Sequence, residues 1–127
     1  MIIGLGIDIV EIDRIRRSLD RFGKRFIEKI LHESEAADLD LADPVKAAQR
    51  VAARFAAKEA GAKALGTGFS AGIGPKDIRV LSLPSGQPVL GLYAAALEHA
   101  DALGVHAAHV SISHGRDTAC AVVVLES

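Results

Sequence analysis

Apolar residues fill nearly every position from 2 to 10, which predicts a strand buried on both faces. Side chains alternate between the two faces of a strand, so the large apolar residues at positions 3, 5, 7 and 9 share one face. The other face carries Gly4, Gly6 and Asp8. Because glycine has no side chain, we expect space above this second face, occupied by something bulky or hydrated.

The pattern then changes to helical spacing. Large apolar residues recur three or four positions apart, at Ile12, Ile15, Leu19, Phe22 and Phe26. They predict a helix, or a pair of helices, broken near Gly23. The acidic stretch that follows, at positions 31–40, predicts a small helix capped at Ser34.

The clearest helix of the chain begins at Pro44. Asp43 is a good N-cap residue, and proline is well suited to the first helical position because its fixed backbone angle matches the helix. The pattern continues to Leu65, where Gly66 ends it.

The second half of the chain alternates strand patterns with one helical pattern. Four glycines make positions 66–75 a loop. The elements expected after it are a strand at 77–83, a strand following the turn 84–88, a helix at 92–104, and a hairpin of 106–114 with 118–126. We therefore predict one α+β domain over residues 1–127, with a small antiparallel sheet, one long helix and several shorter helices.

Composition narrows the class of protein. Half of the 127 residues are apolar, so the chain can build a core without disulfides or a structural zinc ion. Cys120 is the only cysteine, which excludes an intramolecular disulfide and fits a reducing compartment. No apolar run reaches the roughly 20 residues of a membrane helix. The apolar N-terminus lacks the basic leader of a signal peptide. We expect a cytoplasmic protein that does not bind membranes.

The net charge is only −1, but the charges are segregated. Positions 14–25 hold six basic residues and one acid, positions 31–43 hold five acids and no Lys or Arg, and positions 44–63 hold five basic residues and one acid. Two local basic stretches favour local anionic partners over bulk nucleic-acid binding. The few aromatic residues are not interleaved with the basic ones, so a nucleic-acid stacking surface is not expected.

Asp8 is the first candidate for chemistry. A carboxylate within an apolar strand is costly unless it is paired, hydrogen-bonded or bound to a metal. It could equally cap a neighbouring element or pair with Arg14, so Asp8 alone leaves both interpretations open.

The long helix carries the second candidate group. Glu59 and Lys63 lie four residues apart and share a face, while the basic residues at 50, 54 and 58 form a second row. A solvated face of ion pairs is the ordinary interpretation of such spacing. However, Glu59 is the only acid of the basic stretch, and a glycine-rich loop that could help hold phosphate follows the helix. A single carboxylate among cations suits a polyphosphate carried with Mg²⁺.

His114 ends the motif VSISH and is the third candidate. It could bind phosphate or ribose or transfer a proton, or it could be an exposed residue with no role. No Ser-His-Asp arrangement and no zinc-type histidine pair is visible in the sequence.

Three segments together resemble the holo-[acyl-carrier-protein] synthases of the phosphopantetheinyl transferase superfamily. They are GIDIVEIDR at 6–14, RFAAKEAGAKALGTG at 54–68 and VSISHGRDTACAVVV at 110–124. The order and spacing of the three fit over the whole chain, and the middle motif is the most specific. One departure is His32, followed by Glu33, where many members of the family have a threonine followed by an acid; Glu35 keeps the later acidic position.

The resemblance implies transfer of 4′-phosphopantetheine from coenzyme A to a serine of an apo acyl carrier protein in fatty acid biosynthesis. It also implies a homotrimer with active sites between subunits. The site residues carried over by position are Asp8 and Glu59 for Mg²⁺, Glu59 and Lys63 for catalysis, Arg54, Lys58, Lys63 and His114 for coenzyme A, and Arg14, Arg17, Arg21 and Arg25 for the acidic helix of the carrier protein.

Two other classes of function remain open on the sequence. One is a non-catalytic oligomeric module that binds acidic partners through positions 14–25. The other is a metal-dependent phosphohydrolase that uses the same carboxylates and water as the nucleophile.

Overall fold

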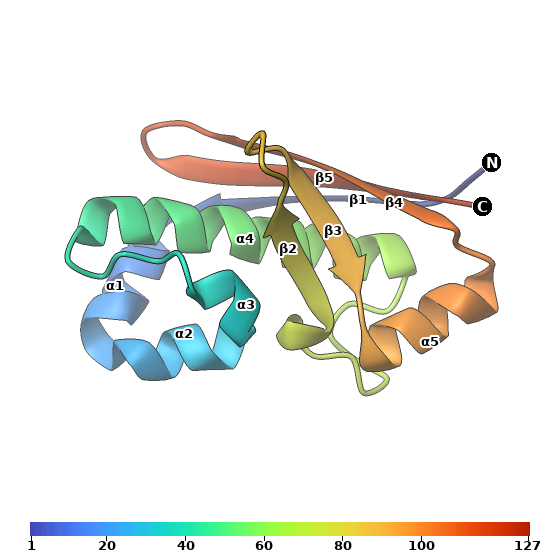
Figure 1. Cartoon of the computed structure of the whole chain (residues 1–127), viewed down its shortest axis with the longest axis horizontal. Helices are drawn as coiled ribbons and strands as arrows, with labels where there is room; N and C mark the ends of the chain where they lie inside the picture. Colours follow the sequence, from blue (N-terminus) through green and yellow to red (C-terminus); the bar gives the residue numbers. More distant parts are fainter.

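Helix α4 (Pro44–Leu65) runs along a three-stranded antiparallel sheet in this computed structural model, which describes all 127 residues (Figure 1). The sheet has the strand order β1-β5-β4, with β1 at Ile2–Glu11, β4 at Ala107–His114 and β5 at Thr118–Glu126. A separate antiparallel hairpin of β2 (Ile78–Ser82) and β3 (Pro88–Leu92) crosses the other side of α4. The predicted α+β architecture is confirmed.

The remaining helices surround α4. Helices α1, α2 and α3 cover its N-terminal half, and α5 lies near its C-terminal end (Figure 1). Their bounds are α1 Ile12–Phe22, α2 Lys24–Ile30, α3 Glu33–Ala36, a 3₁₀ turn η1 at Pro75–Asp77, and α5 Ala94–Leu103. None of the helices is both long and apolar enough to cross a membrane.

Local signals set the ends of α4 as expected. The Asp43 side chain accepts a hydrogen bond of 3.2 Å from the backbone N–H of Lys46, and Pro44 occupies the first turn. At the other end Gly66 adopts a φ of 82°, the left-handed conformation that glycine reaches without strain. The break between α1 and α2 at Gly23 is likewise confirmed.

The cap of α3 differs from the sequence expectation. His32, not Ser34, is its N-cap: the imidazole Nδ1 accepts the N–H of Ser34, and the Glu35 side chain accepts the N–H of His32. Histidine is not among the preferred capping residues, so the pattern pointed to the serine two positions later. The reciprocal pair of bonds is a capping box with histidine in the place of serine or threonine.

The space expected above Gly4 and Gly6 is occupied by α4 itself. A side chain at Gly6 would overlap the carbonyl oxygen of Ala60, and one at Gly4 would overlap the carbonyl oxygen of Ala64. The two glycines therefore let the backbone of the strand and the backbone of the helix come into contact. The expectation of a bulky group above this face was right, but the group is part of the fold and not a ligand.

The prediction that β1 is buried on both faces is wrong for the single chain. Leu5, Ile7 and Ile9 are 66%, 63% and 68% exposed. Their partners on β5 are Val124, Val122 and Cys120, so these residues form a broad apolar surface on the side of the sheet away from α4. Sequence hydrophobicity does not distinguish burial within a chain from burial against another molecule, which is why the pattern misled.

Replacing Gly6 with alanine tests the close approach of α4 and β1. We expect Gly6→Ala to lower the free energy of unfolding by about 3 kcal/mol, because the new methyl group meets helix backbone that cannot rotate away. Chemical denaturation of the two proteins measures this difference.

The matched control is Gly74→Ala, at a position with φ −109° where an added methyl group would have open space within 4 Å. This variant should stay within about 0.5 kcal/mol of the parent. Equal stability of Gly6→Ala and Gly74→Ala would contradict the backbone contact.

Candidate active site

A pocket of about 400 Å³ opens beside the edge strand β1. Strand β1, helices α1 and α2 and the middle of α4 supply its walls, which are lined by Asp8, Ile9, Val10, Glu11, Arg14, Ile15, Ser18, Phe26, Phe55 and Glu59. The pocket therefore brings together both carboxylates singled out in the sequence, together with Arg14. We call it the carboxylate pocket.

Lys63 pairs with Asp8 and not with its helical neighbour Glu59. Its Nζ lies 3.1 Å from Asp8 Oδ1 and donates a second hydrogen bond of 3.0 Å to the carbonyl of Ile7. The side chain of Asp8 is 17% exposed, whereas that of Lys63 is 52% exposed. Neither ordinary interpretation from the sequence describes the site, because Asp8 does not pair with Arg14 and Glu59 does not pair with Lys63.

Glu59 is left without any hydrogen-bond or ion-pair partner. Burial raises the pKa of its carboxyl group above the usual value of 4.5, and the nearby charge of Asp8 raises it further, while Lys63 offsets part of the increase. Two carboxylates thus face one pocket and repel each other, with a single lysine to compensate. A cation placed between them would relieve this repulsion.

The donor set fits Mg²⁺ better than a transition metal. The protein has no cluster of three or more His, Cys, Asp and Glu side chains suited to a metal. Magnesium is commonly held by one or two carboxylates and completes its shell with water and substrate phosphates. Asp8 and Glu59 could supply the protein part of such a shell, since all of their donors are hard oxygen atoms.

A second pocket, of about 300 Å³, lies at the opposite edge of the sheet. Its lining is Lys46, Gln49, Arg50, Ala53 and His114, the last residue of β4. With two permanent cations, one histidine and no acid, it is suited to an anion. We call it the basic pocket. His114 was predicted from its motif, whereas Lys46 and Gln49 were missed, because nothing in the sequence indicates that they lie beside the end of β4.

The two pockets lie on opposite sides of α4. Arg50 and Glu59 are nine residues apart, which corresponds to a rotation of about 180° beyond two full turns. The strands that border the pockets, β1 and β4, are the two edges of the sheet. One extended ligand therefore cannot occupy both pockets of the same chain without passing around the helix.

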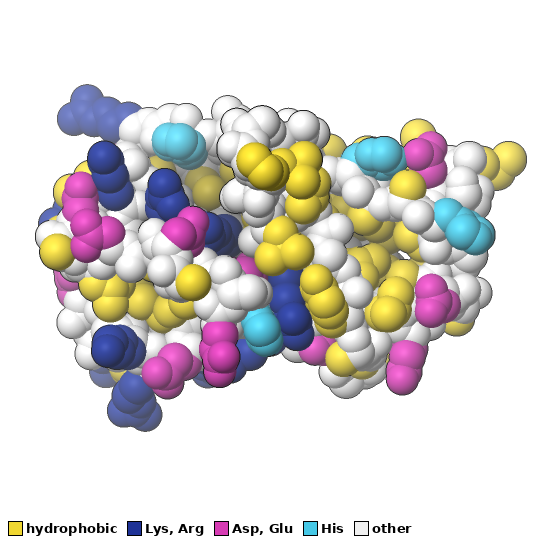
Figure 2. Space-filling model, in the orientation of Figure 1, with side chains coloured by type: hydrophobic (Ala, Val, Ile, Leu, Met, Phe, Trp, Pro, Cys, Tyr) yellow, Lys and Arg dark blue, Asp and Glu magenta, His cyan; other side chains and the backbone are white.

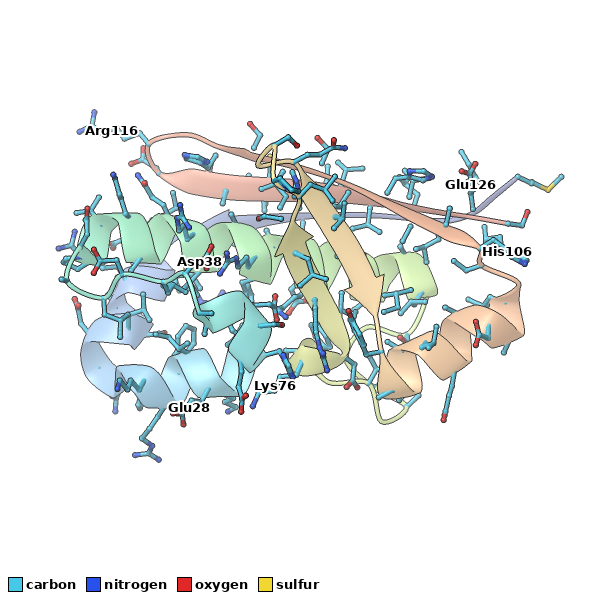
Figure 3. The ribbon with its side chains drawn as sticks, in the orientation of Figure 1. Glu28, Asp38, Lys76, His106, Arg116 and Glu126 are labelled. Carbon is cyan, nitrogen blue, oxygen red and sulfur yellow. The ribbon has the colours of Figure 1, made fainter.

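Arg54 and Lys58, which were expected to line the coenzyme A site, point into the interior. Arg54 donates to the carbonyl of Glu35 and to both carboxylate oxygens of Asp38, at 3.1 and 3.2 Å. Asp38, labelled in Figure 3, lies between α3 and α4. Lys58 is fully buried against Glu35; burial lowers the pKa of its ammonium group and the Glu35 carboxylate offsets part of that effect. Contact of these two residues with coenzyme A remains a prediction. Lys58 would have to leave its present partners to make it, because all three of its protons have acceptors.

The four arginines expected to meet the carrier protein are all exposed. Arg14, Arg17 and Arg21 share a face of α1, and Arg25 follows on α2. Arg17 lies 3.6 Å from Asp13, and Arg21 stacks on the ring of Phe22 at 5.1 Å. Lys and Arg side chains gather over the end of the molecule built by α1, α2 and the start of α4 (Figure 2). Because Arg14 also lines the carboxylate pocket, this basic surface begins at the edge of the site.

The pKa of Glu59 predicts a pH-dependent effect of Glu59→Gln on stability. The folded-state pKa lies above the unfolded value, so the folded state holds the proton more tightly and loses stability as pH rises through the folded pKa. We expect Glu59→Gln to raise the melting temperature in metal-free buffer at pH about 7.5, and to raise it less at pH about 4.

Exposed Glu98 on α5 provides the control, since Glu98→Gln should not change the melting temperature at either pH. Added Mg²⁺ should raise the melting temperature of the parent more than that of Glu59→Gln. An equal difference between Glu59→Gln and the parent at both pH values would contradict the repulsion between the carboxylates.

Comparisons with known proteins agree with this fold. The 4′-phosphopantetheinyl transferase superfamily matches residues 4–123. A holo-[acyl-carrier-protein] synthase of Maridesulfovibrio salexigens is 57% identical over 126 residues, which cover 99% of each chain. The crystal structure of holo-[acyl-carrier-protein] synthase from Neisseria meningitidis is similar over the full length of both chains, with a TM-score of 0.89 and 35% identity. The Helicobacter pylori synthase in complex with coenzyme A has a TM-score of 0.80 and 34% identity, covering 96% of this chain and 99% of that one. The chain therefore belongs to the 4′-phosphopantetheinyl transferase superfamily.

Proposed function

We infer that the chain transfers 4′-phosphopantetheine from coenzyme A to a serine hydroxyl of an apo acyl carrier protein and releases adenosine 3′,5′-bisphosphate. Its relatives over the full length are holo-[acyl-carrier-protein] synthases, and one of them was crystallised with coenzyme A. The observation that carries the mechanism is the carboxylate pocket, which Asp8 and Glu59 both line, with Lys63 paired to Asp8. The fatty acid pathway and the cytoplasmic location remain predictions from the sequence.

We propose that Asp8 and Glu59 hold Mg²⁺ in this pocket. The ion would offset the charge of the pyrophosphate of coenzyme A and help to orient it. Lys63, now 3.1 Å from Asp8, is placed to turn to a phosphate oxygen once the metal satisfies the aspartate. It would then stabilise the charge that develops on the departing bisphosphate.

The reaction is an in-line displacement in this proposal. The serine oxygen of the carrier protein forms a bond to the β-phosphorus, and the bond from that phosphorus to the bridging oxygen breaks. The electron pair leaves with adenosine 3′,5′-bisphosphate, and the serine proton passes to a base. Glu59 is the candidate base and would take the proton through a water molecule, because a carboxylate that also holds Mg²⁺ is by itself a weak base.

The arginine surface on α1 and α2 is the proposed contact with the carrier protein. Arg14 lies in the wall of the carboxylate pocket, so an acidic helix bound along Arg14, Arg17 and Arg21 would deliver its serine beside Asp8 and Glu59. Exposed ion pairs contribute little individually, so we expect these arginines to act on association rate more than on affinity.

We further propose that the active protein is a homotrimer. The outer side of β1 and β5 exposes Leu5, Ile7 and Ile9, a surface typical of an interface between copies. The carboxylate pocket and the basic pocket lie on opposite sides of α4, so coenzyme A spans both only if they come from different copies. In this arrangement the pyrophosphate lies at Asp8 and Glu59 of one copy. The remaining phosphate of coenzyme A, on the ribose, then lies at His114, Lys46 and Arg50 of the next.

Loss of either metal carboxylate should abolish most of the transfer activity. We expect Asp8→Ala and Glu59→Gln each to lower the rate by at least ~10²-fold, because each removes half of the protein's share of the metal site. Mass spectrometry of an apo carrier protein detects the added phosphopantetheine group, with and without a chelator of divalent ions.

Glu98→Gln on α5 should keep the full rate and serves as the control. Near-full activity in either carboxylate variant would overturn the metal assignment. Hydrolysis of coenzyme A without carrier protein would favour a phosphohydrolase, and binding of the carrier without any mass gain would favour a non-catalytic module.

A charge on the outer side of β1 should prevent assembly. Leu5→Glu places a carboxylate in the middle of the apolar surface, and burying it unpaired against a second copy is costly. Light scattering should give the trimer for the parent and a monomer for Leu5→Glu.

Leu103 on α5 is 41% exposed and lies away from this surface, so Leu103→Glu should remain trimeric. A parent protein that stays monomeric at assay concentration would contradict the proposal.

A further inference from the structure

Lys58 and Glu35 form the only ion pair of the protein in which both side chains are fully buried. Lys58 Nζ lies 2.7 Å from Glu35 Oε1, 2.8 Å from the carbonyl of Pro75 and 2.6 Å from the carbonyl of Ile78. An ammonium group has three protons to donate, so all three have acceptors. The transfer mechanism above makes no use of this pair.

Glu35 is equally well satisfied. Its Oε1 also accepts the N–H of His32 at 3.0 Å, and its Oε2 accepts the N–H of Val80 at 3.0 Å. The pair therefore joins the start of α3, the middle of α4, the turn η1 and strand β2 through directional bonds. Every buried polar atom of these side chains is bonded, and a fully satisfied network specifies one arrangement of its members.

The packing around α4 gives this buried ion pair a role in positioning the helix. Most buried residues of this helix are alanines, and the strand next to it offers Gly4 and Gly6. Methyl groups and glycines bring the backbones together, but they provide few large side chains to interlock. The close approach sets the distance between α4 and β1, and the directional bonds of Lys58 add a further constraint on the rotation of α4 about its own axis.

Rotation of α4 directly affects the carboxylate pocket. Glu59 follows Lys58 and lies about 100° further around the helix. A carboxylate about 6 Å from the helix axis moves by about 1.5 Å when the helix turns by about 15°. Displacements of this size are enough to disrupt a catalytic arrangement, since misplacement by about 1 Å can lower a rate about 10²-fold.

We propose that Lys58 is a positioning residue: bonded to Glu35 and to two carbonyls about 100° around α4 from Glu59, it helps to fix the rotation of the helix so that Glu59 faces Asp8. This rests on the proposed function, because it concerns the use of Glu59 in that reaction. In this proposal Lys58, which belongs to the motif at 54–68, acts from inside the fold by positioning Glu59 and not by contacting coenzyme A.

Two alternatives give different outcomes. A lysine that contacts coenzyme A would, when removed, raise the KM for coenzyme A and leave the magnesium dependence unchanged. A lysine that only stabilises the fold would lower the melting temperature, while the folded molecules kept the parent's kinetic constants. A positioning lysine changes the response to magnesium in molecules that remain folded.

The test is Lys58→Met, which keeps an unbranched side chain that is one atom shorter and removes the charge. Folding is first verified by circular dichroism, at a temperature well below the melting transition of the variant. The Mg²⁺ concentration for half-maximal transfer should rise about 10-fold or more and kcat should fall, while the KM for coenzyme A at saturating Mg²⁺ changes less than about 3-fold. The increase in melting temperature produced by Mg²⁺ with coenzyme A, which needs no turnover, should shrink as well.

Leu125→Ala is the matched control, because it removes a fully buried side chain from β5 and lowers stability without touching the Lys58 network. It should keep the parent's magnesium response. If Lys58→Met does not fold, Glu35→Asp replaces it: the charge stays, but the carboxylate retreats from Lys58 by one methylene, and the same changes should occur in smaller measure.

The failure of this inference differs from the failure of the proposed function. A parent that neither transfers phosphopantetheine nor responds to Mg²⁺ would contradict the proposed function itself. A parent that does both, together with a folded Lys58→Met or Glu35→Asp protein whose magnesium response is unchanged, would overturn the positioning role alone.

Discussion

The contact between the backbone of β1 and the backbone of α4 is the constraint on which the rest of the site depends. Gly4 and Gly6 allow it, since any side chain there would overlap the carbonyl oxygens of Ala64 and Ala60. Asp8 lies two residues after Gly6, and Glu59 directly precedes Ala60. The same contact that joins strand and helix therefore brings one carboxylate from each to the carboxylate pocket. The repulsion between them is a cost that the fold carries, and a bound cation would remove it.

Much of the fold could be predicted from the sequence because its signals are local. Asp43, Pro44 and Gly66 set the ends of α4, Gly23 separates α1 from α2, and the turn at 115–117 fixes the β4–β5 hairpin. The wrong predictions concern which parts of the molecule a side chain contacts. A run of apolar residues shows that β1 is hydrophobic, but not that one of its faces is exposed in the single chain. Likewise, the row of basic residues at 50, 54 and 58 looks uniform in sequence, yet it runs from an exposed arginine at the basic pocket to a fully buried lysine.

In the candidate site, too, some features could be predicted from the sequence and others depend on tertiary contacts. Asp8, Glu59 and His114 could be named from the residue types and the motifs that contain them. The partner of Lys63 could not, because a pair between residues 8 and 63 depends on how helix and strand dock. The role of Glu35 was hidden for a similar reason. Among the five acids of positions 31–43 nothing marks it as buried, and only the packing of α3 against β2 places its carboxylate over Lys58.

The position of the two pockets on opposite sides of α4 has a further consequence for the proposed assembly. Each chain then carries half of two different sites, one half at each edge of its sheet. An open chain of copies always leaves one unmatched half at each end, so two associated copies would hold only one complete site between them. A closed ring leaves none and completes as many sites as it has members. In this arrangement the number of complete sites per chain, and with it the activity per chain, would depend on whether the ring has closed.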